Sequence, residues 1–555
     1  MLKDYFEVPN KPAVKSGNIL SCDFTDHETF IPQPLDYSRG TIATYVDCNG
    51  LIKMSGVSDT ESITNGDFSS ASDWNIVNNT GTATEIINGY ARIKTDGAYT
   101  QIEQTNVTTA GKTYKLQYTV LESDGGDLGL IVTGNSTVSI PNNVGTHVFY
   151  FVAHSTSFIL KRRGGALDIK IDNVSVREVD VETPRIDYTT EIGKAKELQK
   201  PSLLLEPQST NIVEFSEDFS ESYWTKSDTT INTNQSISPD GNINADSIVS
   251  STVNSVHYLR HSFVAVTALT PHTYSFFIKP NGYTKFGVRD NAQTGANLTY
   301  DLQTESVIHS ASMTIVVNKL KDNWFRCSLT STIGSNGVAG YALYLLDDGY
   351  GTPPNAGDPN NYNYTGDGVS GFYIYGFQLE QKSFATSYIP TSGGIRTRNG
   401  DVANNAGQLG VFNDEEGVLY AEIAALANDN TYRMMSVNNG NNDNVVNLQF
   451  KNTDNTIRTR IENGGSVQVD MNSTVLNALE FNKVAVKYKA NDFALWINGN
   501  EAVTDPSGST PSGLNQLNFD SGNGSFIFYG KVKEIKVFRR ALTDSELTEL
   551  TNNIV

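Results

Sequence analysis

The 555-residue chain has only three cysteines, Cys22, Cys48 and Cys327, and none of them belongs to a C-x-x-C pair. Zinc sites and disulfide frameworks need closely spaced cysteines, so we expect neither. Such sparse use of cysteine is typical of a protein that assembles in a reducing cytoplasm. A Cys22–Cys48 disulfide is the one alternative that this spacing leaves open.

Positive charge and long apolar runs are also scarce. The chain carries 41 Lys and Arg against 61 Asp and Glu, which gives a formal net charge of −20. Binding to a phosphate backbone needs clustered cations, so nucleic acid is not an expected partner. The first nine residues lack the apolar segment of a signal peptide, and no stretch reaches the roughly 18 apolar residues of a membrane span. We expect neither conventional secretion nor membrane insertion.

Recognisable catalytic motifs are missing as well. The sequence contains no H-E-x-x-H, no G-x-S-x-G and no P-loop. Glycoside hydrolysis needs two carboxylates close together, yet no predicted strand presents such a pair, and Asp414–Glu416 is expected to form a solvated turn. His257 and His261 fall on one face of a predicted strand, where ordinary strand histidines account for them. We therefore predict no catalytic residues, no required cofactor and no enzymatic activity.

The residues that are abundant favour strands. Gly, Asn, Ser, Thr, Tyr and Phe are common, only 18% of the residues are charged, and Tyr90–Lys94 and Tyr114–Val120 alternate apolar with polar residues. Aromatic and β-branched residues suit a pleated, half-buried surface, and alternation with period two marks a strand with one buried face. The predicted fold class is all-β, with tandem antiparallel jelly-roll β-sandwiches behind an irregular N-terminal arm.

Composition and periodicity divide the chain into six parts. These are an N-terminal arm (1–61), a first jelly-roll module (62–178), a return segment (179–211), a second jelly-roll module (212–391), a linker (392–416) and a third module (417–555). The arm either packs on neighbouring parts of the chain or serves as a docking or trimerisation segment. A capping box at Thr543 and Glu546 predicts a short helix at the end of the third module.

The first two modules open alike. Asp67-Phe-Ser is followed by Trp74, and Asp218-Phe-Ser is followed by Trp224. Two copies of one sandwich plan explain this most simply. Because each tryptophan occupies a recurring framework position, we expect Trp74, Trp224 and Trp496 in the core rather than in a ligand site.

Two modules resemble known families. The third, through Leu495-Trp-Ile-Asn-Gly and Gly530–Phe538, is similar to concanavalin A/laminin-G-like jelly rolls. The first, through Asn65-Gly-Asp-Phe and Ile171–Val176, looks like the carbohydrate-binding jelly rolls found beside glycoside hydrolases. The second resemblance implies a structural Ca²⁺ between the first and last strands, with Asp67 and Asp172 at the matching positions. Turn-capping aspartates are the alternative there.

Segments far apart in the chain resemble tail and fibre proteins of tailed bacteriophages. They are Ser38–Ile52, Pro184–Tyr188, Ser202–Asn211 and the stretch from Gly366 to Thr391. The resemblance implies a virion surface protein, a tail or head fibre or decoration, made in the cytoplasm of a bacterial host. Other virion proteins are then the expected partners of the N-terminal arm, and a homotrimer is the expected oligomer. Since the first module separates the first two segments, we interpret it as an insertion.

A tyrosine-rich loop is the predicted glycan site. Between residues 347 and 364 it combines rings with acidic acceptors, a mixture suited to stacking on sugars and hydrogen bonding their hydroxyls. The residues are Tyr350, Tyr362, Tyr364, Asp347, Asp348 and Asp358. An ordinary surface loop is the alternative.

Three functions remain open at this point. The first is a non-enzymatic virion protein that presents glycan-binding sandwiches for attachment to a host or surface. The second is a virion-associated polysaccharide depolymerase, which the lack of a carboxylate pair disfavours. The third is a bacterial glycan-binding adhesin, which the lack of a signal peptide disfavours.

Overall fold

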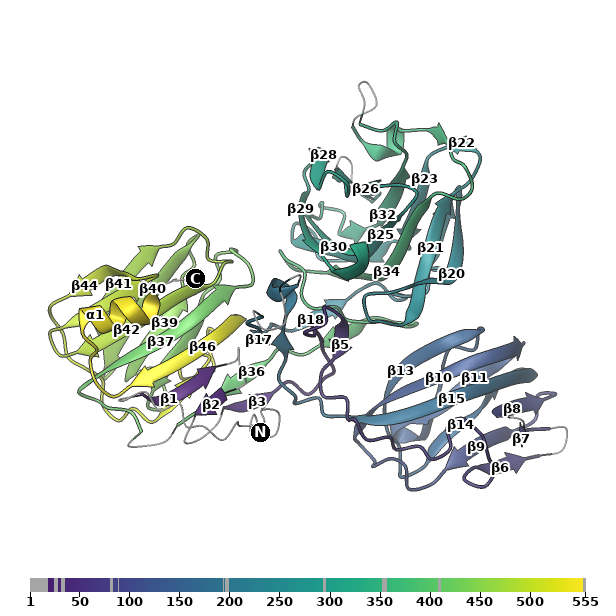
Figure 1. Cartoon of the computed structure of the whole chain (residues 1–555), viewed down its shortest axis with the longest axis horizontal. Coiled ribbons are helices and arrows are strands. Elements are labelled where there is room, and N and C mark those ends of the chain that lie inside the picture. Colours follow the sequence, from purple (N-terminus) through teal and green to yellow (C-terminus); the bar gives the residue numbers. More distant parts are fainter. Residues whose placement is uncertain are drawn as a thin grey trace. The chain divides into compact units, whose positions relative to one another are not determined.

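The computed structural model describes residues 18–23, 28–30, 35–79, 83–87, 89–192, 194, 199–292, 296–351, 357–407 and 411–552. Much of the predicted docking arm, residues 1–17, 24–27 and 31–34, lies outside this range. Every pairing between named strands in the described part is antiparallel, which confirms the all-β prediction (Figure 1). The described helices include none with the length and hydropathy of a membrane span. Cys48 and Cys327 carry free thiols, so the alternative Cys22–Cys48 bridge is not formed.

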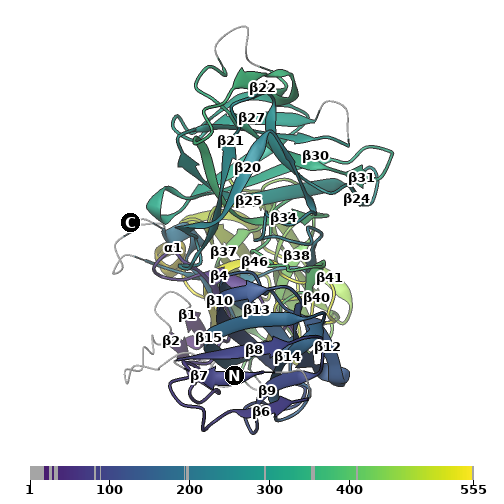
Figure 2. The same ribbon diagram turned by 90° about the vertical axis from the view of Figure 1, so that its right-hand side faces the viewer.

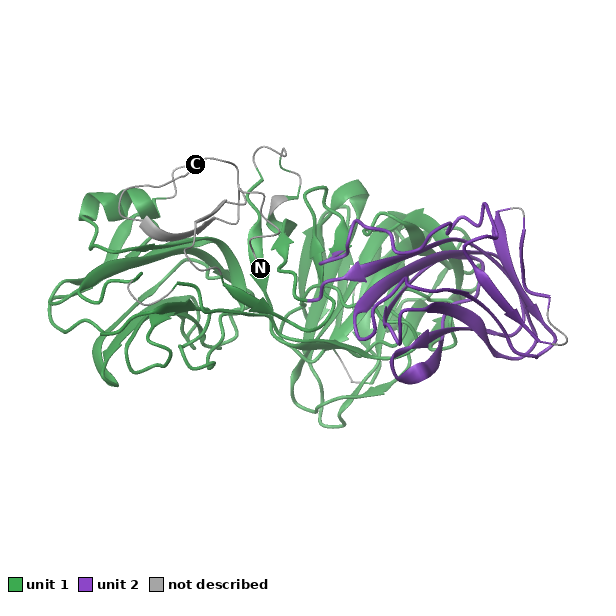
Figure 3. Cartoon of the chain, turned by 90° about the horizontal axis from the view of Figure 1, so that it is seen from below, with its two compact units in different colours: residues 1–53, 182–555 green, residues 54–181 purple. Residues whose placement is uncertain are grey.

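The chain divides into two compact units, residues 54–181 and the remainder, 1–53 with 182–555 (Figure 3). The smaller unit begins and ends at one place, because the amide of Asp180 donates to the carbonyl of Gly56 at 2.8 Å and Val57 bridges to Val179. Inserted domains are tolerated where their termini are adjacent.

The smaller unit is a sandwich of two five-stranded sheets, ordered β13-β10-β15-β8-β7 and β12-β11-β14-β9-β6. Alternating residues such as Leu116, Tyr118 and Ile169 point between the sheets and are fully buried. The elements are β6 (Asn75–Asn78), β7 (Glu85–Ile87), β8 (Tyr90–Thr95), β9 (Thr100–Gln104), β10 (Thr113–Asp124), β11 (Asp127–Val132), η2 (Thr133–Asn135), β12 (Ser136–Ser139), β13 (Gly145–Val152), β14 (Phe158–Gly164) and β15 (Leu167–Val179).

The second sandwich has two six-stranded sheets, ordered β19-β23-β32-β26-β27-β28 and β20-β21-β34-β25-β30-β29 (Figure 2). Aromatic residues including Tyr274, Phe276 and Phe377 fill its core. The main elements are β19 (Trp224–Ser227), β20 (Thr229–Ile237), β21 (Ile243–Ser250), β23 (His257–His261), β25 (Pro271–Asn281), β26 (Lys285–Asp290), β27 (Asn297–Asp301), β28 (Ser306–Ala311), β29 (Thr314–Lys319), η5 (Lys321–Asn323), β30 (Phe325–Thr332), β32 (Tyr341–Leu346), η6 (Pro359–Asn361) and β34 (Gly371–Glu380). Short pairs complete it: β22 (Asn254–Ser255) with β33 (Tyr364–Thr365), and β24 (Val264–Ala265) with β31 (Val338–Ala339).

The two sandwiches share one topology. In chain order, β6 to β15 of the first correspond to β19, β20, β21, β23, β25, β26, β27, β30, β32 and β34 of the second, and the order within both sheets is the same. The second sandwich adds β28 and β29 as edge strands. The predicted duplication of one sandwich plan is therefore present in the strand order as well as in the opening motif.

The third sandwich ends in the predicted helix. Its strands are β37 (Glu416–Ala425), β38 (Arg433–Asn438), β39 (Val445–Phe450), β40 (Thr456–Asn463), β41 (Ser466–Thr474), β42 (Asn482–Lys489), β43 (Phe493–Ile497), β44 (Asn500–Asp505), β45 (Gln516–Asn518) and β46 (Gly530–Phe538). Helix α1 (Asp544–Thr551) has the expected capping box of Thr543 and Glu546. Through Leu547, helix α1 packs against Trp496 and neighbouring residues of the sheet that contains β37, β42, β43 and β46.

Upstream segments complete this third sandwich. Strand β46 pairs with β1 (Asn18–Asp23) and with β17 (Ser202–Leu205), which extend the larger sheet. The other short strands are β2 (Glu28–Phe30), β3 (Asp36–Ser38), β4 (Thr44–Val46), β5 (Ile52–Met54), β16 (Ile186–Asp187), β18 (Ser209–Asn211), β35 (Arg396–Arg398) and β36 (Val402–Asn404), with η3 (Thr189–Glu191). The described parts of the arm, return segment and linker therefore pack on neighbouring parts of the chain.

Candidate functional site

The tyrosine-rich loop folds back onto its own sandwich. It leaves β32 and places η6 against the outer face of β26, where Pro359 lies so close to Gly287 that an added Cβ would come within 2.7 Å of it. Tyr350 is only 1% exposed and packs with Ala342 and Tyr344 of β32. The loop closes this apolar outer face, because leaving such a surface in water costs free energy.

A glycan site on this loop needs accessible rings, and the prediction is wrong in this respect for Tyr350 and Tyr364, which are buried. Tyr364 is 7% exposed, and its hydroxyl donates to the carbonyl of Leu345 at 3.2 Å. Tyr362 is half-buried and donates to Asp347, which together with burial holds its pKa above the ordinary value. Residues 352–356 of the loop lie outside the described residues.

The three aspartates of the loop differ in their surroundings. Asp358 caps η6 through the amide of Asn360 at 2.9 Å and pairs with Arg289 at 3.1 Å. Asp347 is half-buried, and Asp348 is exposed. Tyr350, Tyr364 and Asp358 therefore hold the loop on its sandwich. A role of Asp347, Asp348 or Tyr362 in glycan binding stays a prediction.

In the described part of the first sandwich, no loop lies over the equivalent face. The strand registers of the two sandwiches match residue by residue. In the first sandwich, Lys161 pairs with Gly129 on one side and with Gln101 on the other. In the second sandwich, Tyr344 takes the place of Lys161 and pairs with Gly287 and with Tyr258. Polar side chains occupy the positions that in the second sandwich lie under the loop. We call this surface the open face. It consists of Asn75, Tyr99, Gln101, Glu103 and Lys161.

Side chains of the open face form one connected network. Glu103 accepts hydrogen bonds from the amide of Asn75 at 2.8 Å and from the amide of Gln101 at 2.7 Å. The hydroxyl of Tyr99 donates to Gln101, and the ammonium of Lys161 lies 4.8 Å from the centroid of the Tyr99 ring. Tyr99 nevertheless stays 38% exposed. An accessible ring beside fixed amide, carboxylate and ammonium groups is suited to a sugar.

Sequence reasoning missed the open face, although a signal was present. Residues 99–103 alternate Tyr, Gln and Glu on one side of the strand with Thr and Ile on the other. Such a pattern places the three polar or aromatic side chains on the outer face. It was hidden because every half-buried strand shows the same alternation.

Asp67 and Asp172, the predicted calcium ligands, each make local contacts. Asp67 accepts from the amide of Ser69 at 3.3 Å and from its hydroxyl at 3.1 Å. Asp172 accepts from the amide of Asn173 at 2.6 Å. Within the described residues, no group of three or more His, Cys, Asp or Glu side chains is placed to hold a metal ion. These contacts fit the turn-capping alternative, and the structural calcium stays a prediction.

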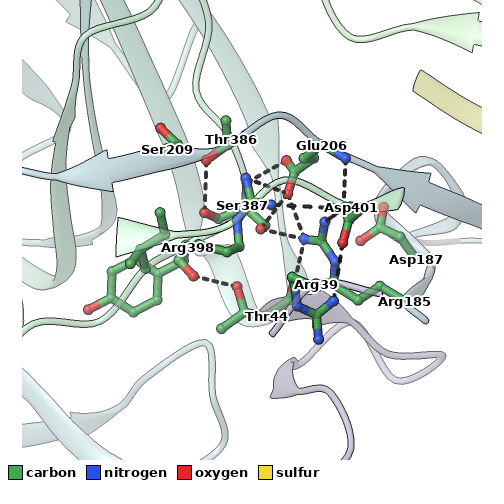
Figure 4. Close-up of polar contacts among 12 residues, drawn as sticks. Arg39, Thr44, Arg185, Asp187, Glu206, Ser209, Thr386, Ser387, Arg398 and Asp401 are labelled. Atoms are coloured by element: carbon green, nitrogen blue, oxygen red, sulfur yellow. Dashed lines mark hydrogen bonds and ion pairs between the residues drawn. The ribbon is translucent and has the colours of Figure 1, made fainter. Parts of the chain in front are cut away.

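A buried ionic cluster joins four segments that are far apart in the sequence, 38–52, 184–188, 202–211 and 366–391 (Figure 4). Arg185 donates to Glu206 at 2.6 Å and to Ser387 at 2.7 Å, and it also pairs with Asp401. Arg39 reaches Asp401 at 3.3 Å. The side chains of Arg185, Arg39 and Asp401 have no exposed surface.

This cluster joins segments that are far apart in the sequence. Arg39, Arg185, Glu206 and Ser387 come from four separate stretches of the chain, and the charges of Arg185 and Glu206 are satisfied only when these stretches meet. Burial alone would raise the pKa of Glu206, but the guanidinium groups of Arg398 and Arg185 hold it well below its usual range. A buried charge that loses its partner is costly, so the segments are bound to one another.

The predicted linker also contributes to this cluster. Arg398 lies 3.4 Å from Glu206, and Asp401 accepts from the amide of Glu206 at 2.7 Å. Strands β35 and β36 lie in this predicted linker and pair with β18 and β3, so its described part is packed structure and not a free linker.

Two carboxyl groups of the second sandwich have raised pKa values. Asp246 is 2% exposed, and burial raises its pKa to about 7, although the amides of Asn234 and Phe219 oppose the shift. Burial and the neighbouring Asp240 raise the pKa of Glu217 to about 7. Tyr388 and Tyr375 donate to Glu217 at 2.8 and 3.0 Å.

The raised pKa of Asp246 predicts a pH-dependent stability. Its carboxyl binds more protons in the folded than in the unfolded state between about pH 4 and 7, so the stability that it contributes is lost as pH rises through that window. Relative to wild type, Asp246→Asn should gain stability from pH 4 to 7, on the order of 2–4 kcal/mol. Urea unfolding of both proteins at several pH values measures this. If the free energy of unfolding changed with pH in the same way in both proteins, the pKa of Asp246 would not be raised in the folded state.

Comparisons with known proteins identify the third sandwich. Residues 419–548 match the family described as the concanavalin A-like lectin/glucanases superfamily, which confirms the resemblance of that module. No curated protein matches the chain.

A comparison with solved structures found matches that include the following three. The Ruminococcus gnavus IT-sialidase CBM40 bound to α2,3-sialyllactose has 19% identity, covers 27% of this chain and 94% of its own, and has a TM-score of 0.23. Domains LG4-5 of the mouse laminin α1 chain have 10% identity, with coverage of 55% and 92% and a TM-score of 0.19. Trypanosoma rangeli sialidase has 9% identity, with coverage of 93% and 99% and a TM-score of 0.21. At these values the similarities carry no argument about ligands.

Proposed function

We propose that this chain is a non-enzymatic glycan-binding protein, exposed on the surface of a bacteriophage virion as a tail or head fibre or decoration, that attaches the particle to host or environmental glycans. The open face of the first sandwich carries the proposal. Tyr99 offers a ring for the C–H surface of a sugar, while Lys161 and Glu103 offer a donor and acceptors. The buried Gln101 fixes the positions of Tyr99 and Glu103 through its hydrogen bonds to both.

The contacts of Glu103 support binding rather than catalysis. Both of its oxygens accept hydrogen bonds from side-chain amides, Asn75 on one and Gln101 on the other. A glycosidase needs one carboxylic acid for proton transfer and a second carboxylate as base or nucleophile. A carboxylate held as an acceptor by two amides is suited to orienting its neighbours.

The proposed place in a virion is supported by the buried ionic cluster. The segments that resemble phage fibre proteins supply Arg39, Arg185 and Glu206, and the predicted linker supplies Arg398 and Asp401. These parts of the chain together would form a common scaffold for the attached sandwiches. Contact with other virion proteins through the N-terminal arm and a homotrimeric assembly belong to the same proposal. Several copies on one particle would turn weak single-site binding into strong attachment.

Removing the Tyr99–Lys161 pair tests the proposed function. On an array of bacterial surface glycans, Tyr99→Ala with Lys161→Ala should lower binding at least tenfold, since ring and ammonium are lost together. The matched control is Tyr90→Ala with Lys170→Ala, a similar pair on the other sheet of the same sandwich, with the ammonium 5.2 Å from the ring centroid. Equal binding by all three proteins would contradict the proposal. Release of reducing ends from the bound glycan would show a depolymerase instead.

A further inference from the structure

A pocket lies where the β4–β5 hairpin meets the second sandwich. It encloses about 340 Å³ and is lined by three turns: the hairpin tip at Gly50 and Leu51, the β20–β21 turn at Ser236–Pro239, and the β29–β30 turn at Leu320–Trp324. Lys279 of β25 completes the wall. Small-molecule pockets in proteins occupy roughly 300–1,000 Å³, so this volume suits one small ligand.

The walls of the pocket are held rigidly. The amide of Ile52 donates to the carbonyl of Pro239 at 2.9 Å, which fixes the hairpin on the β20–β21 turn. The indole of Trp324 donates to the carbonyl of Ile237 at 3.0 Å, which ties the other two turns together. A preformed cavity loses little entropy when a ligand enters it.

The β29–β30 hairpin ends in a tight two-residue turn beside the pocket. Asp322 and the following Asn323 both have left-handed backbones, with φ of 56° and 61°. Aspartate and asparagine tolerate this conformation, which a two-residue hairpin turn requires. The turn presents the side chains of Lys321 and Asp322 at the rim, and both are exposed.

The charges around the pocket favour an anion. Two lysines, Lys279 and Lys321, line it against the single carboxylate of Asp322. The ammonium of Lys279 lies 5.9 Å from the centroid of the Tyr373 ring, and among the ion pairs of the described residues neither lysine takes part. Two uncommitted cations in one pocket are notable in a chain with a net charge of −20.

We propose that this pocket binds a small hydroxylated carboxylate, a sugar acid, either free or at the end of a glycan chain. The ammonium groups of Lys279 and Lys321 hold the carboxylate, and Asp322 accepts hydrogen bonds from ring hydroxyls. The hydroxyl of Ser236 can donate or accept, and Leu51 contacts the apolar ring surface, while the buried Trp324 forms the floor of the pocket. The site is separate from the open face, so the two proposals stand independently.

Binding of glucuronate to the full chain tests this proposal. Trp324 lines the pocket, so glucuronate should change the intrinsic fluorescence and raise the Tm, whereas glucose should do neither. Lys279→Ala with Lys321→Ala should weaken binding at least tenfold. Tyr99→Ala with Lys161→Ala, which lies outside the pocket, should respond like wild type.

An oligosaccharide that ends in glucuronate distinguishes the two sources of the ligand. A response to the free acid, or to the oligosaccharide alone, supports the pocket and identifies which form it takes. The proposal is overturned if neither ligand binds at tens of millimolar, if glucose binds as well as glucuronate, or if the double lysine variant, folded with the wild-type Tm, binds equally well.

Discussion

Replacing Arg185 with alanine is expected to destabilise the larger unit by about 3–5 kcal/mol, because the change leaves two buried carboxylates without their shared cation. The guanidinium contacts Glu206, Ser387 and Asp401 at a place with no exposed side-chain surface. Scanning calorimetry should show a lower Tm for this unit, while the transition of residues 54–181 stays in place.

An exposed ion pair of the same unit provides the control. Arg540 pairs with Glu546 at the C-terminal helix, where the side chains keep 43% and 40% of their surface in water. Arg540→Ala should cost about 0–1 kcal/mol, as exposed pairs do. If Arg185→Ala cost no more than Arg540→Ala, the buried cluster would not be what holds the phage-like segments together.

The two framework tryptophans should give matching effects in different sandwiches. Trp74 and Trp224 are 5% and 2% exposed, and each indole donates at 3.0 Å to a carbonyl nine residues earlier, that of Asn65 or Phe215. Removal of such a ring leaves a cavity and an unpaired carbonyl, so alanine should cost about 3–5 kcal/mol at either position.

Calorimetry assigns each loss to its own transition. Trp74→Ala should lower the melting temperature of residues 54–181 alone, and Trp224→Ala that of the larger unit alone. Phenylalanine at either position retains most of the packing and should cost less than alanine. A loss under 1 kcal/mol at one position, with a full loss at the other, would mean that the two sandwiches do not share one framework.

Local patterns in the sequence predicted much of the fold. Alternation identified strands such as β8 and β10, and the capping box at Thr543 placed the single described α-helix. The Asp-Phe-Ser and Trp motifs revealed the duplication, and Trp74, Trp224 and Trp496 are buried as predicted. These features depend on neighbouring residues, so a single sequence records them.

Features that depend on distant contacts were beyond the same reasoning. Arg39 and Asp401 are 362 residues apart, and a charged residue in an irregular segment is ordinarily exposed. Tyr350 and Tyr364 also looked like surface rings, since the sequence does not show that β32 has an apolar outer face that needs covering. Their burial follows from how the loop folds onto Ala342 and Tyr344.

Hydrogen–deuterium exchange of the full chain, with and without a glycan that it binds, tests most directly whether the open face is the binding surface. The account predicts slower exchange in residues 75–78, 100–104 and 158–164, because these strands carry Asn75, Gln101, Glu103 and Lys161. It predicts little change in the second sandwich, where the tyrosine-rich loop already covers the equivalent face. Protection confined to the second or third sandwich, with residues 100–104 and 158–164 unchanged, would contradict it.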